Sequence, residues 1–397
     1  MVDVKIIQDK IIRYIDEHKN EYENIAKAIW EKPEISNYEF FACKTLSDKL
    51  KEEGFEIEEN AAGHRTGFEA VKKSNKPGPV IAFLAEYDAL EGLGHACGHN
   101  IIGATSTFAG IALSKVIDEV GGEVRVYGTP GEEGGEEGSA KESFVREGYF
   151  KDVDAALIAH PGTLNLLTGT SLANDPIDIE FFGKPAHAAS IPEQGINALD
   201  AVIQVYNGIN ALRQHLPSDV RIHGIITNGG SAPNIVPDYA KARFYLRSAS
   251  RTTLNDVFAK VERIVEGAGL LTGAKGRVIR YQNKVDNLIP TPIFDEVYKK
   301  HLEAFGETLD ERGSGLGSTD VGNVSQVVPT IHPSIKVTDV KCGGHTVEFK
   351  EQCAKPKALE SCSLGAKILS FTALDLILDP ELLKAIKEQH KAVTSQN

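Results

Sequence analysis

The sequence predicts an α/β protein with a mixed, largely parallel sheet that carries a smaller inserted α+β domain. Short apolar runs alternate with helical stretches in the first part of the chain, as in a sheet covered by helices. A second block, from about residue 175, has the ferredoxin-like order strand, helix, strand, strand, helix, strand. Because the α/β pattern resumes after about residue 290, we expect a discontinuous main domain over 1–174 and 286–397, and an inserted domain over 175–285.

Two amphipathic helices are expected before the first strand. Isoleucines recur at helical spacing from Ile6 to Ile29, with charged residues between them. A second helix is expected around residues 39–53, because Gly54 follows it as a stop signal.

Three apolar runs of strand length follow, at 79–85, 123–128 and 154–159, with a helix expected over 101–119. Each run ends in acidic residues or a histidine. In open α/β sheets, ligands bind at the carboxyl ends of the strands. This recurrence is the first indication of a functional site.

The inserted domain is expected to contain four strands and two helices. The strands are predicted at 177–182, 221–227, 239–246 and 277–281, and the helices at 196–215 and 253–267.

The composition narrows the class of protein. Hydrophobic residues make up 41% and charged residues 25% of the chain, which excludes wholesale disorder. The formal net charge of −13 disfavours nucleic acid and anionic membranes as partners. No run approaches about 18 consecutive apolar residues, and the N-terminus lacks the apolar run of a secretory signal. We therefore expect a cytoplasmic protein, and its five cysteines do not indicate a disulfide framework.

The strongest chemical signal is the segment GHACGHN at 94–100. Thiolate and imidazole are good ligands for zinc and related ions. Gly98 permits an unusual backbone turn, which lets Cys97 and His99 face one point. The segment lies between a strand end and a helix start, where an ionised thiol is favoured.

The second signal is TPGEEGG at 129–135, which places Glu132 and Glu133 in a glycine-rich loop at a strand end. Such a loop can be merely solvated. Alternatively, one carboxylate binds a metal and the other acts as a general base. His160 stands at the next strand end, and a late histidine, His332 or His345, offers a further ligand. Spacing does not choose between these two.

Six motifs in register resemble the M20 metallopeptidase family, and within it the amidohydrolase branch of aminoacylases, auxin-conjugate hydrolases, aminobenzoyl-glutamate hydrolase-like and dipeptidase-like proteins. They are GHACGHN, TPGEEGG, AHPG, GKPAHAASIPEQGINALDA, APNIVPDYAKARFYLRS and GGHTVEF. They cover nearly the whole chain. The resemblance implies a zinc-peptidase-like catalytic domain with an inserted lid and dimerisation domain, and hence a homodimer or a larger homo-oligomer.

The resemblance also implies roles for individual residues. Cys97, His99, Glu133 and His160 would be metal ligands, and Glu132 would be the general base.

The late ligand would be His345 rather than His332, and Asp88 would orient a ligand. His187, in the inserted domain, would polarise the substrate carbonyl, in its own or the partner subunit's active site.

Asn234 and Arg247 match positions that bind the substrate carboxylate or line the oxyanion site. Two departures concern the finer substrate class. Asn100 stands where many branch members have Asp, and the first strand ends in Glu86-Tyr87-Asp88 rather than Asp-Met-Asp.

The implied reaction is hydrolysis of the amide bond of a small N-acyl amino acid or dipeptide, by a metal-activated water with Glu132 as base. Zn²⁺ is the expected metal because of the thiolate, one or two ions per subunit, with Mn²⁺, Ni²⁺ and Co²⁺ as alternatives. Two other hypotheses stay open. Cys97 could act as a nucleophile without metal, or the chain could be a non-catalytic scaffold on a hydrolase fold.

Overall fold

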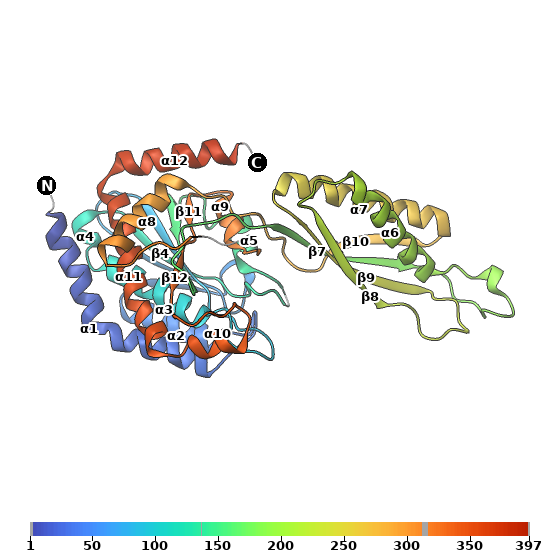
Figure 1. The fold of residues 1–397 in the computed structure, drawn as a ribbon, viewed down its shortest axis with the longest axis horizontal. Helices are drawn as coiled ribbons and strands as arrows, with labels where there is room; N and C mark the ends of the chain where they lie inside the picture. The colour runs from blue at the N-terminus through green and yellow to red at the C-terminus, as the bar shows by residue number, and fades with distance from the viewer. Residues whose placement is uncertain (1–2, 136, 312–316, 396–397) are drawn as a thin grey trace. The chain divides into compact units, whose positions relative to one another are not determined.

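The computed structural model describes residues 3–135, 137–311 and 317–395. The chain forms two compact units, Met1–Thr170 with Leu288–Gln396, and Ser171–Asn287 (Figure 1). The boundary expected after residue 174 falls inside a strand, β7 (Ala173–Phe182), which belongs wholly to the second unit. The boundary expected after residue 285 would detach Asn287, whose side chain accepts a hydrogen bond from the Arg251 N–H within that unit.

The first unit is built on a six-stranded mixed sheet in the order β1-β2-β4-β3-β5-β11. The strands are β1 (Glu56–Glu59), β2 (Phe68–Lys73), β3 (Val80–Ala85), β4 (Glu123–Gly128), β5 (Ala155–Leu157) and β11 (Thr330–Ile331). β3 runs parallel to β4 and β5, and β5 parallel to β11, whereas β2 is antiparallel to β1 and β4. A separate parallel pair joins β6 (His160–Gly162) and β12 (Ser334–Lys336).

Burial of the central strand β3 on both faces explains why all of its residues are apolar. Ile81, Phe83 and Ala85 belong to the core that α1, α3 and α11 cover, whereas Ala82 and Leu84 belong to a second core on the other side. A parallel strand covered on both faces needs apolar residues at every position rather than at alternate ones. The run VIAFLA at 80–85 satisfies this requirement.

The helices of the first unit cover both faces of the sheet (Figure 1). They are α1 (Val4–Glu31), α2 (Phe40–Glu52), α3 (His99–Ser114), α4 (Ile117–Val120), α5 (Ala140–Glu147), α8 (Pro292–Ala304), α9 (Val321–Ser325), α10 (Val347–Gln352), α11 (Pro356–Leu378) and α12 (Pro380–Thr394), with a 3-10 turn at Ala61–Gly63. The single helix expected over 101–119 is two helices, α3 and α4. Every residue of α3 is buried.

Helix α11 is long and apolar enough to cross a membrane, by length and composition alone. In this structure 78% of its apolar window is buried inside the protein, where α11 packs against α1 and α3. These properties are those of a core helix.

The second unit is a ferredoxin-like α+β domain. Its elements are β7 (Ala173–Phe182), α6 (Ala198–Leu212), β8 (Arg221–Asn228), β9 (Tyr239–Ser248), α7 (Arg251–Thr272) and β10 (Lys275–Arg280), with 3-10 turns at Pro192–Gln194 and Arg213–His215. The sheet is antiparallel throughout, in the order β10-β7-β9-β8. β9 alternates buried and half-buried residues, as a sheet with one covered face requires. β8 lies at the edge and is exposed at every position except Ile222.

Replacing Gly110 of α3 by Ala should destabilise the protein. A Cβ at this position would lie 2.4 Å from Val126 Cγ2 of β4, so helix and sheet approach too closely for a methyl group. Overpacking costs about 1–3 kcal/mol, which outweighs the gain of about 1 kcal/mol in helix propensity. Urea unfolding followed by circular dichroism should therefore give a lower midpoint for Gly110→Ala.

Gly267→Ala is the matched control. It also lies inside a helix, α7, but apart from its own chain neighbours and the nearby helix backbone, no described atom lies within 4 Å of where its Cβ would be. This variant should be as stable as the wild type or more so. A Gly110→Ala protein of undiminished stability would contradict the close helix–sheet packing.

Candidate metal centre

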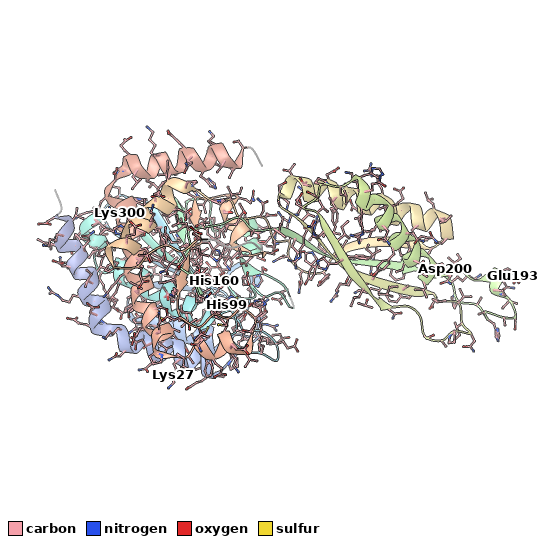
Figure 2. All side chains as sticks on the ribbon, viewed as in Figure 1. Lys27, His99, His160, Glu193, Asp200 and Lys300 are labelled. Carbon is pink, nitrogen blue, oxygen red and sulfur yellow. The ribbon has the colours of Figure 1, made fainter. Side chains whose placement is uncertain are left out.

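The polar residues singled out in the sequence lie at the carboxyl ends of three neighbouring strands. β3, β4 and β5 are adjacent and parallel, so their carboxyl ends share one edge of the sheet. Asp88 follows β3, Glu132 and Glu133 follow β4, and His160 follows β5. Figure 2 shows His160 close to His99, and their ring centroids are 5.9 Å apart.

A left-handed glycine directs Cys97 and His99 into this edge. Gly98 precedes the first residue of α3 and has φ +79°, a conformation that side chains with a Cβ rarely adopt. A Cβ there would also lie 2.5 Å from Pro161 Cγ. The backbone therefore reverses at Gly98, and Cys97 and His99 are brought to the same centre.

Three overlapping groups of ligand atoms form the centre, and within each group the atoms lie within 4.8 Å of one another. The groups are Cys97, His99 and His160; Cys97, Glu133 and His345; and His99, Glu132 and Glu133. Cys97 Sγ is 3.4 Å from His160 Nε2, and His345 Nε2 is 3.2 Å from Glu133 Oε1. Together the groups hold all five residues that the resemblance implies as ligands, and Glu132.

Asp88 holds two members of the centre in place. Its Oδ1 accepts a hydrogen bond from His99 Nδ1 at 2.8 Å, and its Oδ2 accepts one from the Glu133 N–H at 2.9 Å. Ser36 Oγ donates a third, at 3.1 Å. Burial acts to raise the pKa of Asp88, but His99 and these hydrogen bonds outweigh it and bring the pKa to about 2. Asp88 is therefore a charged acceptor that fixes the tautomer of His99.

His160 is oriented in a similar way. Its Nδ1 donates to the carbonyl oxygen of Pro161 at 2.8 Å, which leaves Nε2 as the bare ring nitrogen facing Cys97. Burial lowers the pKa of His160, so the ring is held in the neutral form that ligates metals.

The neighbouring acids and burial shift the chemistry of Glu132 and Cys97. Burial, Glu133 and Glu86 raise the pKa of Glu132 well above its usual value, which suits a proton acceptor that must later release its proton. Burial raises the pKa of the Cys97 thiol, although His99 opposes the shift. A half-buried thiol with a raised pKa is a poor nucleophile alone, whereas coordination to a cation would deprotonate it.

The donor set fits a divalent metal ion. His99 Nε2 is buried and has no hydrogen-bond partner in the described part of the chain. Buried polar atoms without partners are rare in folded proteins. Thiolate, imidazole and carboxylate are the ligands of zinc centres, so one cation at this position would satisfy this nitrogen.

The two candidate late ligands, His345 and His332, differ in their position and in their backbone conformation. His345 has φ +60°, an uncommon conformation outside glycine that recurs at functional sites, and its N–H donates to the carbonyl oxygen of Ala96 at 2.9 Å. His332 lies beside His160, with ring centroids 5.5 Å apart, and is in none of the three groups.

Three of the residues implied by the resemblance belong to the second unit. His187 is exposed in a segment that pairs with the segment of Asn234, where the Ala188 N–H donates to the Asn234 carbonyl oxygen at 3.0 Å. Its Nδ1 accepts from the backbone N–H of Ala189 and of Ser190, so a neutral ring carries its proton on Nε2. Arg247 lies on β9, opposite Asn174 of β7.

The sequence motifs do not predict every residue of the centre. Glu86 stands out in the sequence only as a departure from Asp, yet its side chain is buried beside His99, with Oε2 3.6 Å from His99 Nε2. Lys141 and Asp320 were not singled out, and both contact this region from fully buried positions. The one signal available was the alternation in Glu86-Tyr87-Asp88, which puts both acids on one side of the chain.

Comparisons with known proteins show which proteins this chain resembles. Residues 177–270 match a peptidase dimerisation domain. The Xaa-Arg dipeptidase of Mus musculus is 33% identical, over 98% of this chain and 93% of its own. A p-aminobenzoyl-glutamate hydrolase chain of Escherichia coli is 31% identical, over 97% of this chain and 96% of its own. The crystal structure of a dinuclear metal-binding peptidase of the M20 family from Bacillus subtilis has the same fold, with a TM-score of 0.65 at 21% identity, over 91% of this chain and 99% of that one.

Replacing Asp88 by Asn should weaken metal binding. The amide offers one acceptor in place of two and no charge, so either His99 Nδ1–H or the Glu133 N–H would face another donor. Loss of such outer contacts typically lowers metal affinity about 10–100-fold. Competition with a chromophoric chelator measures this change.

Ser36→Ala is the matched control, because it removes only the hydroxyl donor to Asp88 Oδ2. Its affinity should change far less. Equal losses in the two variants would show that Asp88 does not act through His99 and Glu133.

Proposed function

Because the chain belongs to the M20 peptidase family and is a hydrolase of amide bonds, we propose that it cleaves a dipeptide or N-acyl amino acid with a free carboxylate, with Glu132 as the general base. One observation carries the proposal. Five ligand-type side chains (Cys97, His99, Glu133, His160 and His345) converge beside Glu132, whose pKa is raised.

Zinc is the metal that this donor set favours. A thiolate among imidazoles and carboxylates selects softer ions over magnesium or calcium, and manganese, nickel and cobalt are the alternatives. The Bacillus subtilis relative is described as dinuclear. The three overlapping donor groups provide enough ligand atoms for one or two ions here. When bound, a divalent cation supplies Lewis acidity, which polarises an amide carbonyl and acidifies water.

The protein's own residues move the proton. Glu132 accepts the proton of the attacking water and then delivers it to the leaving amine nitrogen, because its carboxylate lies beside the ligand-type side chains. His187, through Nε2–H, donates a hydrogen bond to the carbonyl oxygen as negative charge develops there. It acts in its own subunit or in the partner subunit.

The substrate is a small molecule with an amide to an amino acid. The relatives are named for Xaa-Arg dipeptides and for p-aminobenzoyl-glutamate, and both names describe such an amide. Asn234 and Arg247 are proposed to bind the free carboxylate, through an amide donor and a guanidinium. We also propose a cytoplasmic location, in keeping with five free thiols.

The chain is proposed to form a homodimer through β8. The family match in this unit is a dimerisation domain. β8 is an edge strand, and its Ile225 and Ile226 are 64% and 43% exposed. An exposed apolar edge strand is a template for pairing with another strand. A second copy of β8 offers the same surface, as a two-fold symmetric contact requires.

The two rival hypotheses are weaker on chemical grounds. A thiol nucleophile would need a lowered pKa, whereas burial raises that of Cys97. A non-catalytic scaffold would not require a general base such as Glu132 beside the five ligand-type side chains.

Glu132→Gln should lower kcat by at least about 100-fold while metal content stays at the wild-type level, because the amide cannot accept a proton. A panel of dipeptides and N-acyl amino acids, with elemental analysis of each protein, measures both quantities. Chelation should abolish wild-type activity, and added Zn²⁺ should restore it.

Glu133→Gln is the contrasting variant, since it should lose metal as well as activity. Cleavage that survives chelation and disappears in Cys97→Ser would instead establish the thiol mechanism. A metal-loaded protein that cleaves no member of the panel would contradict the proposed function.

Ile225→Lys/Ile226→Lys should convert the dimer to a monomer, because charges on an edge strand oppose strand pairing. In sedimentation equilibrium, the dimer dissociation constant of this variant should be at least about 10-fold higher than that of the wild type, which corresponds to about 1.4 kcal/mol. Leu270→Lys, on α7 and 81% exposed, is the control and should stay dimeric. A monomeric wild type would contradict the assembly.

A further inference from the structure

Two carboxylates flank the two nitrogens of His99. Asp88 Oδ1 is 2.8 Å from Nδ1, and Glu86 Oε2 is 3.6 Å from Nε2. The backbone carbonyl of Asp88 also lies 3.1 Å from Nδ1, so this nitrogen carries the ring proton. Nε2 therefore faces the oxygen of Glu86, and it offers a lone pair there when the ring is in the neutral form that ligates metals.

This second contact is not a hydrogen bond. At 3.6 Å the atoms are too far apart for one. Both atoms are buried, and neither has a hydrogen-bond partner within the described ranges. A carboxylate and an imidazole this close need a shared cation, which is a proton on Nε2 in the metal-free protein and a metal ion in the loaded one. Two ligands about 2.1 Å from one tetrahedral zinc ion lie about 3.4 Å apart, close to the observed separation.

A buried lysine fixes the direction of Glu86. Lys141 Nζ lies 2.7 Å from Glu86 Oε1 and donates to Asp320 Oδ1 at 2.6 Å. The Lys141 N–H also points to Asp320 Oδ2, at 3.3 Å. Oε1 of Glu86 is thus engaged by Lys141, whereas Oε2 faces His99.

The charges of this cluster call for another cation. Lys141 carries one positive charge, whereas Glu86 and Asp320 carry two negative charges, and all three side chains are at most 1% exposed. A net negative charge in the interior is costly unless it is paired.

We propose that Glu86 is a further metal ligand of this centre, binding through Oε2 the same ion as His99 Nε2, and that Lys141 is the positioning residue that aims it. The proposal rests on the metal-dependent function proposed above. Glu86 directly follows β3. The proposal gives a role in metal coordination to this Glu, which stands where the commoner family pattern has Asp.

Metal titration of variants tests this ligand. Apo wild type, Glu86→Gln and Asp320→Asn are each titrated with Zn²⁺ against a chromophoric chelator, and with Co²⁺ by visible absorption. Glu86→Gln should weaken the affinity for at least one ion about 10-fold or more and change the Co²⁺ spectrum. Asp320→Asn is the matched control, because it makes the same carboxylate-to-amide change on the other partner of Lys141 and leaves Glu86 in place. The metal affinity and Co²⁺ spectrum of this variant should stay close to those of the wild type.

Glu86→Asp separates ligation from charge. It keeps the negative charge beside Lys141 but withdraws the oxygen from His99, so it too should weaken binding, and it serves if Glu86→Gln fails to fold. Wild-type affinity in either folded Glu86 variant, or equal weakening in Asp320→Asn, would overturn the assignment. A wild type that binds neither ion would instead refute the metal-dependent function itself.

Discussion

The parallel pairing of β3 with β4 and with β5 is the constraint on which the centre depends. This pairing places three carboxyl strand ends on one edge, and each end delivers a ligand-type side chain. The pairing in turn requires β3 to be apolar on both faces, which VIAFLA provides. The close approach of α3 at Gly110 brings His99, its first residue, over the same edge. Packing of the core and geometry of the site therefore have one origin.

Electrostatic compensation is the second requirement. The centre gathers four acids, Glu86, Asp88, Glu132 and Glu133, within the shell of one histidine, His99, and Glu133 is linked to it through Asp88. Such a cluster is unfavourable in the interior unless cations and donors offset it. Backbone N–H groups and Lys141 supply part of the compensation. A divalent cation bound here would supply the rest, so that the same residues would serve both the stability of the metal-loaded protein and the proposed reaction.

Much of the fold could be predicted because its signals are local. The strands at 79–85 and 123–128, and the order of elements in the inserted block, follow from apolar runs and periodicity. β1 and β2 were missed, because EIEE and FEAVKK mix charge with short length and look like loops. The helix expected over 101–119 ends at Ser114, and α4 follows as a separate helix. The sequence does not mark this break, because the apolar residues continue through Val116 and Ile117.

The centre was predictable only where a motif carried it. Cys97, His99, Glu132 and Glu133 stand in short segments whose chemistry is visible in the sequence. Glu86, Lys141 and Asp320 are distant in sequence, and only the folded chain brings them together. A buried lysine gives no local signal, because sequence patterns place lysines at the surface.

X-ray diffraction from crystals of the zinc-loaded protein, with anomalous data at the zinc edge, tests the account most directly. The account predicts an anomalous peak about 2.0–2.3 Å from His99 Nε2 and from a further atom of the set, Cys97 Sγ or a carboxylate oxygen. Anomalous density confined to other parts of the protein, with Cys97 and His99 bound to no ion, would contradict it.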